Sequence, residues 1–367
     1  MRWDYGSSFT FLVAPAIYFL LAATCPPAGA EEKKRKPVSV EPQFLSNIHQ
    51  LTNGFEKAGE GYFSPDGKTI IYQAIRREYP FYQIYTQPLD GDRPKLISTG
   101  RGRTTCSNFS PDGQRILFAS SHLDPDLYGT EERVRKQQEE DRRTGRRRRY
   151  SWPFDRSMEI FETDLNGKIL RRLTNKPGYD AEGAYSRDGK LIAYCHDNGT
   201  RDKPDPNIYV MNADGSDKRQ ITNAPGYDGG PFISPDGKWI VFRSDRKLEH
   251  HLQIFVVGVD GKNETALTKD QNFVNWGPYW HSSQPYIIWS GADHSNPQAR
   301  PNYDLWITRY EVKDGRFTIG PISRVTDHSS ADVLPVFSPD GKKLMWTSTR
   351  TKNHSSQLWI ADFAPPE

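Results

Sequence analysis

Three features of the 367-residue sequence predict an all-β fold, a six-bladed β-propeller. A strand–turn–strand unit built on Ser-Pro-Asp-Gly recurs six times, a hairpin unit follows it, and the first segment of the predicted domain matches the end of such a repeat. Four strands at a spacing of about 40–50 residues are typical of a propeller blade. A linear solenoid or a β-sandwich is the alternative, but solenoid repeats are shorter.

The first half of the repeat is clearest in Phe232–Ser244, FISPDGKWIVFRS. In its turn Pro235 presets φ, Asp236 tolerates the turn geometry, and Gly237 adopts a positive φ without a Cβ clash. The β-rich run that follows is apolar on both faces, which predicts a strand buried between stacked sheets. The other copies start at Tyr62, Asn108, Ala184, Val336 and, in a degenerate form, Tyr279.

The second half of the repeat predicts a hairpin, with Asp-Gly or Asn-Gly at its turn and a Leu-Thr-like pair at its end. Copies start at Gln83, Glu159, Asn207 and Gln253. Asn47–Thr52, NIHQLT, matches the last strand of this unit, whereas the final repeat, Val336–Phe363, has three strands. We therefore predict that the N-terminal strand closes the ring, which removes two exposed sheet edges; a loose N-terminal arm is the alternative.

The N-terminus has the pattern of a signal peptide, assigned to residues 1–30. Arg2 precedes an apolar run, Phe9–Ala23, and Ala28–Ala30 has the small-x-small pattern of a cleavage site. A retained anchor or a lipoprotein modification at Cys25 is the alternative. We therefore expect a periplasmic or secreted protein.

A charged linker is expected at residues 31–41 and the propeller at 42–363, with an insertion at 121–156 in blade two. The insertion contains good helix formers in Glu131–Arg143 and a four-arginine run, Arg146–Arg149. It is either a solvated excursion or a contact for an anionic surface. The net charge of +3 is too small to indicate a nucleic-acid partner. A monomer is expected.

The Ser-Pro-Asp-Gly units, the Asp-Gly hairpins and the Leu-Thr endings resemble the TolB-like, WD-type β-propeller repeat family. The resemblance covers nearly all of Asn47–Phe363 and includes the periplasmic protein of the Tol–Pal system. It implies a binding module for a protein or cell-envelope component, with a peptidoglycan-associated lipoprotein as one candidate partner. The α/β domain that precedes the family's propeller has no counterpart here, so coupling to inner-membrane proteins is not expected.

Similar propellers also accompany peptidase domains, or act as oligogalacturonate lyases with metal-binding histidines. The sequence has no Gly-x-Ser-x-Gly nucleophile motif, and the spacing of His281, His294 and His328 fits no metal motif. A disulfide between Cys106 and Cys195 is not expected, because they occupy different blade positions. We therefore favour a non-catalytic binding module over a lyase or hydrolase, and predict no catalytic or metal-ligating residue.

Two positions in each repeat, six and four residues before the serine of the turn, lie where the innermost strand starts. In a propeller these starts converge on the axis, so they predict a channel mouth. Converging carboxylates should attract a cation, an amine or a basic peptide, and an oxygen-rich ring suits calcium, the one cofactor considered. Alternatively, each aspartate caps a turn of its own blade. The predicted ligand-binding residues are Glu60, Arg103, Thr104, Asp180, Glu182, Asp228, Asn275 and Asp332.

Overall fold

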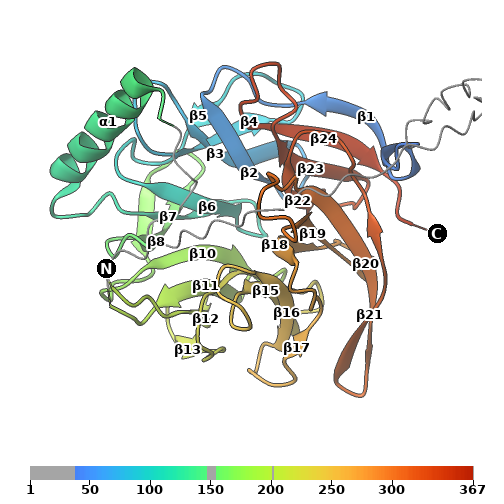
Figure 1. Cartoon of the computed structure of the whole chain (residues 1–367). Coiled ribbons are helices and arrows are strands. Elements are labelled where there is room, and N and C mark those ends of the chain that lie inside the picture. The colour runs from blue at the N-terminus through green and yellow to red at the C-terminus, as the bar shows by residue number, and fades with distance from the viewer. Residues whose placement is uncertain (1–37, 147–153, 201, 367) are drawn as a thin grey trace, which may run out of the picture. The chain divides into compact units, whose positions relative to one another are not determined.

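The Ser-Pro-Asp-Gly turns connect the first two strands of six four-stranded antiparallel sheets, which stand around a common axis (Figure 1). This is the predicted six-bladed β-propeller. The structure is a computed structural model that describes residues 38–146, 154–200 and 202–366. The predicted signal peptide, most of the linker and most of the four-arginine run lie outside the described residues.

Each blade runs from its innermost to its outermost strand in chain order, except the last, in which β1 is outermost. Blade one consists of β2 (Lys57–Phe63), β3 (Thr69–Ile75), β4 (Gln83–Pro88) and β5 (Lys95–Leu96). Blade two consists of β6 (Thr104–Phe109), β7 (Arg115–Ser120), β8 (Glu159–Asp164) and β9 (Ile169–Arg172). Blade three consists of β10 (Asp180–Tyr185), β11 (Leu191–Asp197), β12 (Pro206–Asn212) and β13 (Arg219–Gln220). Blade four consists of β14 (Asp228–Ile233), β15 (Trp239–Ser244), β16 (Gln253–Gly258) and β17 (Thr265–Ala266). Blade five consists of β18 (Phe273–Trp280), β19 (Tyr286–Asp293), β20 (Asp304–Lys313) and β21 (Arg316–Arg324). Blade six consists of β22 (Asp332–Phe337), β23 (Lys343–Ser348), β24 (Gln357–Phe363) and β1 (Leu45–Gln50).

The N-terminal strand β1 closes the ring, as predicted. It pairs antiparallel with β24, with Leu45 opposite Phe363 and Gln50 opposite Trp359. A short 3₁₀ helix, η1 (Glu41–Gln43), leads into it. Because β1 supplies the fourth strand of blade six, this blade has the same four-stranded form as the other five.

The Leu-Thr ending of each repeat has a structural role. Its hydroxyl accepts a hydrogen bond from a backbone N–H near the start of the third strand, at 2.8–3.0 Å in all six blades; the donor is the second residue of that strand, or the third in blade three. The bond therefore ties the outer segment of the blade to its middle. In blade six Thr52, just after β1, accepts from the N–H of Leu358. The acceptors are Ser98, Thr174, Thr222, Thr268, Thr326 and Thr52.

The apolar core lies between neighbouring blades. Both faces of the second strand are buried, as the sequence predicts: in β15, Val241 packs toward blade five and Phe242 toward blade three. Six such clusters fill the six blade interfaces. The cluster between blades five and six includes Phe44 and Leu45, so ring closure also buries apolar side chains.

Every innermost strand carries a β-bulge near its start, where its pairing with the second strand shifts register. The bulged residue has a left-handed backbone with φ of 48–60°, although only two of the six are glycine. A bulge changes the direction of the side chains on either side of it, so it decides which residues face the axis. The six bulge residues are Glu60, Cys106, Glu182, Gly230, Gly277 and Leu334.

The insertion in blade two forms the helix α1 (Leu127–Thr144). Its buried Glu131 accepts hydrogen bonds from Arg101, from the Tyr79 hydroxyl and from the backbone N–H of Gly102. The described part of the insertion is thus docked against blade one rather than free in solvent (Figure 1). Within the described residues, no helix combines the length and apolar character needed to cross a membrane.

Candidate functional site

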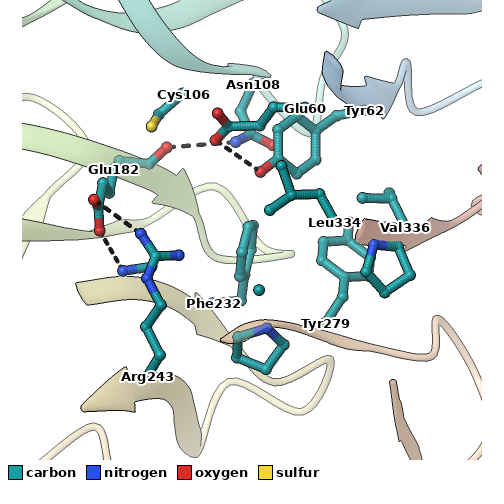
Figure 2. A pocket seen from close by; sticks show the side chains of 15 residues that line it. Glu60, Tyr62, Cys106, Asn108, Glu182, Phe232, Arg243, Tyr279, Leu334 and Val336 are labelled. Atoms are coloured by element: carbon teal, nitrogen blue, oxygen red, sulfur yellow. Dashed lines mark hydrogen bonds and ion pairs between the residues drawn. The ribbon is translucent and has the colours of Figure 1, made fainter. Parts of the chain in front are cut away.

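All six bulge residues line one cavity on the propeller axis, with a volume of about 30 Å³. A second layer lies two residues further along the strands and consists of Tyr62, Asn108, Phe232, Tyr279 and Val336 (Figure 2). Most of these side chains are half-buried, so solvent reaches the cavity. The cavity has room for about two water molecules, since one water needs roughly 10–15 Å³ by this measure.

An aromatic cluster from three blades constricts the channel at this second layer. The ring centroids of Phe232 and Tyr279 are 4.9 Å apart, and those of Tyr62 and Phe232 are 5.8 Å apart. The Tyr62 and Tyr279 rings are 6.2 Å apart and complete the triangle. Figure 2 shows the three rings facing one another across the axis. Apolar rings at these separations attract one another, so they narrow the channel below the bulge residues.

A second contact joins two blades at the opposite end of the innermost strands. The guanidinium of Arg187, which replaces the proline in the turn of blade three, donates to the Ser282 carbonyl at 2.7 Å. Ser282 lies in the degenerate turn of blade five, so the bond links two blades that are separated by blade four. Both contacts lie on the turn side of the bulge residues, so they obstruct that end of the channel.

At the bulge end, Glu182 is fully engaged by protein groups. Arg243 donates to its carboxylate at 3.0 Å, and the Tyr227 hydroxyl donates at 2.8 Å. The backbone N–H of Gly230 donates as well. A Cβ atom at position 230 would lie 2.3 Å from the Arg243 guanidinium, so glycine at this bulge makes room for the ion pair. Glu182 therefore anchors the channel wall, and its charge is compensated.

Glu60 is the other carboxyl group in the cavity, and it has no salt bridge within the part of the chain that the structure describes. Its side chain receives a long hydrogen bond of 3.4 Å from Tyr62. Loss of bulk water around the carboxyl raises the pKa of Glu60 from 4.5 to about 7; the hydrogen bond with the Cys106 thiol and the charge of Arg243 oppose the shift, and the charge of Glu182 adds to it. Glu60 therefore changes charge near neutral pH.

The Cys106 thiol lies beside Glu60 and completes this part of the wall (Figure 2). Burial and the neighbouring Glu60 raise the pKa of the Cys106 thiol well above its ordinary value. The thiol is therefore neutral, and a neutral thiol is a poor nucleophile and a poor metal ligand. Both Cys106 and Cys195 are free.

The eight residues predicted to line the channel mouth fall into two groups in the structure, those that line the cavity and those that bond to other protein groups. Only Glu60 and Glu182 line the cavity. Asp228 and Asp332 are buried in ion pairs with Arg246 and Arg350, and the Asp180 carboxylate lies at a hydrogen-bond distance of 2.8 Å from Nδ1 of His196.

The remaining three predicted residues also point away from the cavity. Thr104 donates to the Tyr82 carbonyl, and Asn275 accepts from Trp289. The guanidinium of Arg103 lies 4.2 Å from the centroid of the Phe81 ring. In five of the six blades the position six residues before the turn thus holds a polar side chain that bonds to other protein groups and does not line the cavity; in blade one it holds Ala58. The second position, four residues before the turn, is the bulge residue itself, and it is this residue that lines the cavity.

Sequence reasoning did not identify the aromatic constriction or Arg243. The aromatic residues occupy one repeat position, two residues before the turn serine, in three of the six copies, and this alignment was a usable signal. Arg243 was visible as the one charge within the apolar run WIVFRS. A charge in a strand that is buried on both faces requires a partner, and Glu182 supplies it.

Among the described residues, no three His, Cys, Asp or Glu side chains gather in a way that could hold a metal ion. His281 is buried against Phe337, and its Nε2 lies 3.2 Å from the Gly341 carbonyl. His294 lies beside Tyr303 and His251.

No protein-family model matches the chain. Among curated proteins, an uncharacterized protein of Agrobacterium fabrum is 30% identical over 156 residues, which is 41% of this chain and 42% of that protein. The match thus spans less than half the length of this relative.

Solved structures match over most of the chain. A protein of Agrobacterium tumefaciens solved as a candidate TolB is similar with a TM-score of 0.55 and 21% identity, over 87% of this chain and 97% of that chain. The chain shares the β-propeller fold of that structure. TolB from Acinetobacter baumannii matches the chain with a TM-score of 0.51 and 18% identity, over 86% of this chain and 65% of that one.

An oligogalacturonate lyase from Vibrio parahaemolyticus matches the chain about equally well, with a TM-score of 0.53 and 11% identity, over 86% of this chain and 93% of that chain. At these identities the similarities establish the fold alone, because one fold hosts many functions. The function has to be argued from the channel itself.

Proposed function

We propose that this TolB-like propeller is an exported, non-catalytic binding module that recognises a protein or a cell-envelope component through its channel mouth. The observation that carries the proposal is a carboxyl group, Glu60, that lines the constricted channel and forms no salt bridge with a described residue. Glu182 is already paired with Arg243 and leaves Glu60 as the group available to a ligand.

The dimensions of the cavity indicate what Glu60 binds. About 30 Å³ above the Tyr62–Phe232–Tyr279 constriction accommodates a narrow group and not a sugar ring. The group that best matches an uncompensated carboxyl is a cation such as an ammonium or a guanidinium, which stabilises the ionised carboxylate. The ammonium group of a lysine side chain of an envelope protein meets both requirements. A peptidoglycan-associated lipoprotein is one candidate for that protein.

The competing function is a lyase or hydrolase with its site at the channel mouth, because an oligogalacturonate lyase shares the fold. A glycan substrate would have to bind outside the constriction, with Glu60 as the titrating group. The binding module is favoured because the cavity is water-sized and because burial keeps the neighbouring Cys106 thiol neutral.

The test is affinity capture from envelope extract with the whole purified protein as bait. Glu60→Gln removes the charge at nearly constant volume, and Glu132→Gln, on the outer side of α1, is the charge-matched control. The proposal is supported if the parent and the control retain a component that Glu60→Gln captures at least about tenfold less well. A loss of this size is expected because a charge-assisted bond contributes about 1.5–3 kcal/mol. An identical captured set for all three baits contradicts it, and cleavage of a retained glycan supports the competing function.

A further inference from the structure

A second and larger hollow lies outside the channel, between blade one and the inserted helix α1. Its volume is about 520 Å³, which falls within the range of small-molecule sites. Four segments line it: the loop that follows β1, the loop between β3 and β4, the β4–β5 hairpin and the end of α1 (Figure 1). The lining residues are Gly54, Phe55, Glu56, Arg76, Arg77, Glu78, Pro94 and Arg142.

The docking of α1 explains why its last turn stands over this hollow. The helix is fixed by Glu131 at its start and by Gln138, whose side-chain amide donates to the Pro80 carbonyl at 3.0 Å. Arg142 follows Gln138 by four residues, so it lies on the same face of the helix, one turn further along. Glu131 and Gln138 thus hold Arg142 opposite the blade-one loop 76–78.

Three arginine residues, Arg76, Arg77 and Arg142, line the hollow. Arg76 lies over two rings, 5.8 Å from the Phe55 centroid and 5.3 Å from the Tyr85 centroid, which fixes its orientation. Within the described residues, neither Arg77 nor Arg142 forms a salt bridge, and both side chains are exposed. Two arginine side chains with free donors beside a fixed third are suited to an anionic group, because guanidinium binds carboxylate in a bidentate manner.

The two carboxylates of the hollow, Glu56 and Glu78, restrict the type of anion. Neither takes part in a salt bridge with a described residue, and both are exposed. They repel a multiply charged phosphate but accept hydrogen bonds from hydroxyl groups. Phe55 and Pro94 add apolar surface suited to the C–H face of a sugar ring. The lining therefore matches a molecule that carries one carboxylate, several hydroxyls and an apolar face.

We propose that this groove between blade one and α1 binds an acidic saccharide through Arg77 and Arg142, with its hydroxyl groups on Glu56 and Glu78. The site is separate from the channel, and the proposal stands whether or not the channel binds a cation. It also gives the insertion a role as the second wall of a ligand groove.

Calorimetric titration of the whole protein tests the assignment, with a diglucuronate as the probe. D-glucose oligomers of the same length and inorganic phosphate are the comparison ligands. Arg142→Ala and Arg77→Ala are each expected to weaken diglucuronate binding about tenfold, because each removes a charge-assisted bond. Arg143→Ala is the matched control: it removes the same charge from the next residue, which pairs with Glu140 and does not line the groove.

The expected result is that the parent binds diglucuronate and shows little binding of glucose oligomers or phosphate. Diglucuronate binding should be lost in the Arg77 and Arg142 variants and retained within about twofold in the Arg143 variant. Phosphate binding as tight as diglucuronate binding would overturn the proposal, since it would show a site for anions alone. Equal losses for Arg142→Ala and Arg143→Ala would also overturn it, because they would indicate diffuse attraction to a basic helix. An absence of diglucuronate binding to the parent would also overturn the proposal.

Discussion

Replacing Glu60 by glutamine should stabilise the propeller at alkaline pH and leave its stability at acid pH nearly unchanged. The pKa of Glu60 is about 7 in the folded chain and 4.5 without the fold. Between these values the folded chain binds more protons than the unfolded chain, so the Glu60 contribution to stability falls as the pH rises from 4.5 to about 7. Glutamine does not titrate and lacks this dependence.

The size of the effect follows from the interval between the two pKa values. At 1.36 kcal/mol per pKa unit, complete ionisation of Glu60 costs at most about 3 kcal/mol, and solvent in the cavity reduces this. Urea unfolding of the parent and Glu60→Gln at pH 5 and pH 8 gives the difference directly. The variant should gain on the parent by about 1–3 kcal/mol between the two pH values.

Glu182→Gln is the matched control for this experiment, since it changes the other channel carboxyl in the same way. It breaks the ion pair with Arg243 and should destabilise the protein at both pH values. The reasoning about Glu60 would be refuted by a difference between parent and Glu60→Gln that is the same at pH 5 and pH 8.

Three further outcomes can be measured on the same protein. Deletion of Phe44–Asn53 removes β1 and the Thr52 bond and should lower stability by several kcal/mol; a melting temperature within a degree or two of the parent would show that β1 is dispensable. Asp180→Asn with Asp228→Asn should lower the melting temperature and leave capture of the channel ligand unchanged, because both side chains are buried against His196 and Arg246; the reverse pattern would restore them as ligand residues. Glu131→Ala should release α1 and abolish diglucuronate binding with little change in the melting of the propeller, whereas retained binding would show that the groove does not depend on the docked helix.

The sequence predicts the fold because the signals of a propeller are local and repeated. Each Ser-Pro-Asp-Gly turn places a hydroxyl and a carboxylate two residues apart, and they bond to each other, as Ser234 does to Asp236. The unmatched segment Asn47–Thr52 predicts ring closure because every repeat needs a residue like Thr52 to accept the N–H of its third strand. Such patterns require no knowledge of distant contacts.

The channel wall was less predictable because it depends on strand pairing. A bulge is defined by two strands together, and in Glu60, Cys106, Glu182 and Leu334 the left-handed residue is not the glycine that marks such a conformation. Without the bulge, the alternation along the strand places Asp180 and Glu182 on one face, whereas the structure separates them. The docking of α1 could not be predicted either, because the contact is polar and runs through Glu131. Such a contact leaves no apolar periodicity in the sequence of the helix.

Counting the protons released on binding tests the channel proposal most directly. Titration of the captured envelope component into the parent at pH 6.5, in two buffers of different ionisation enthalpy, gives that number. With the pKa of Glu60 at about 7, a cation that requires the ionised carboxylate should release roughly 0.8 of a proton from the parent and none from Glu60→Gln, which should also bind more weakly. Equal affinity and equal proton release for both proteins would contradict the assignment of Glu60 as the channel's ligand-binding group.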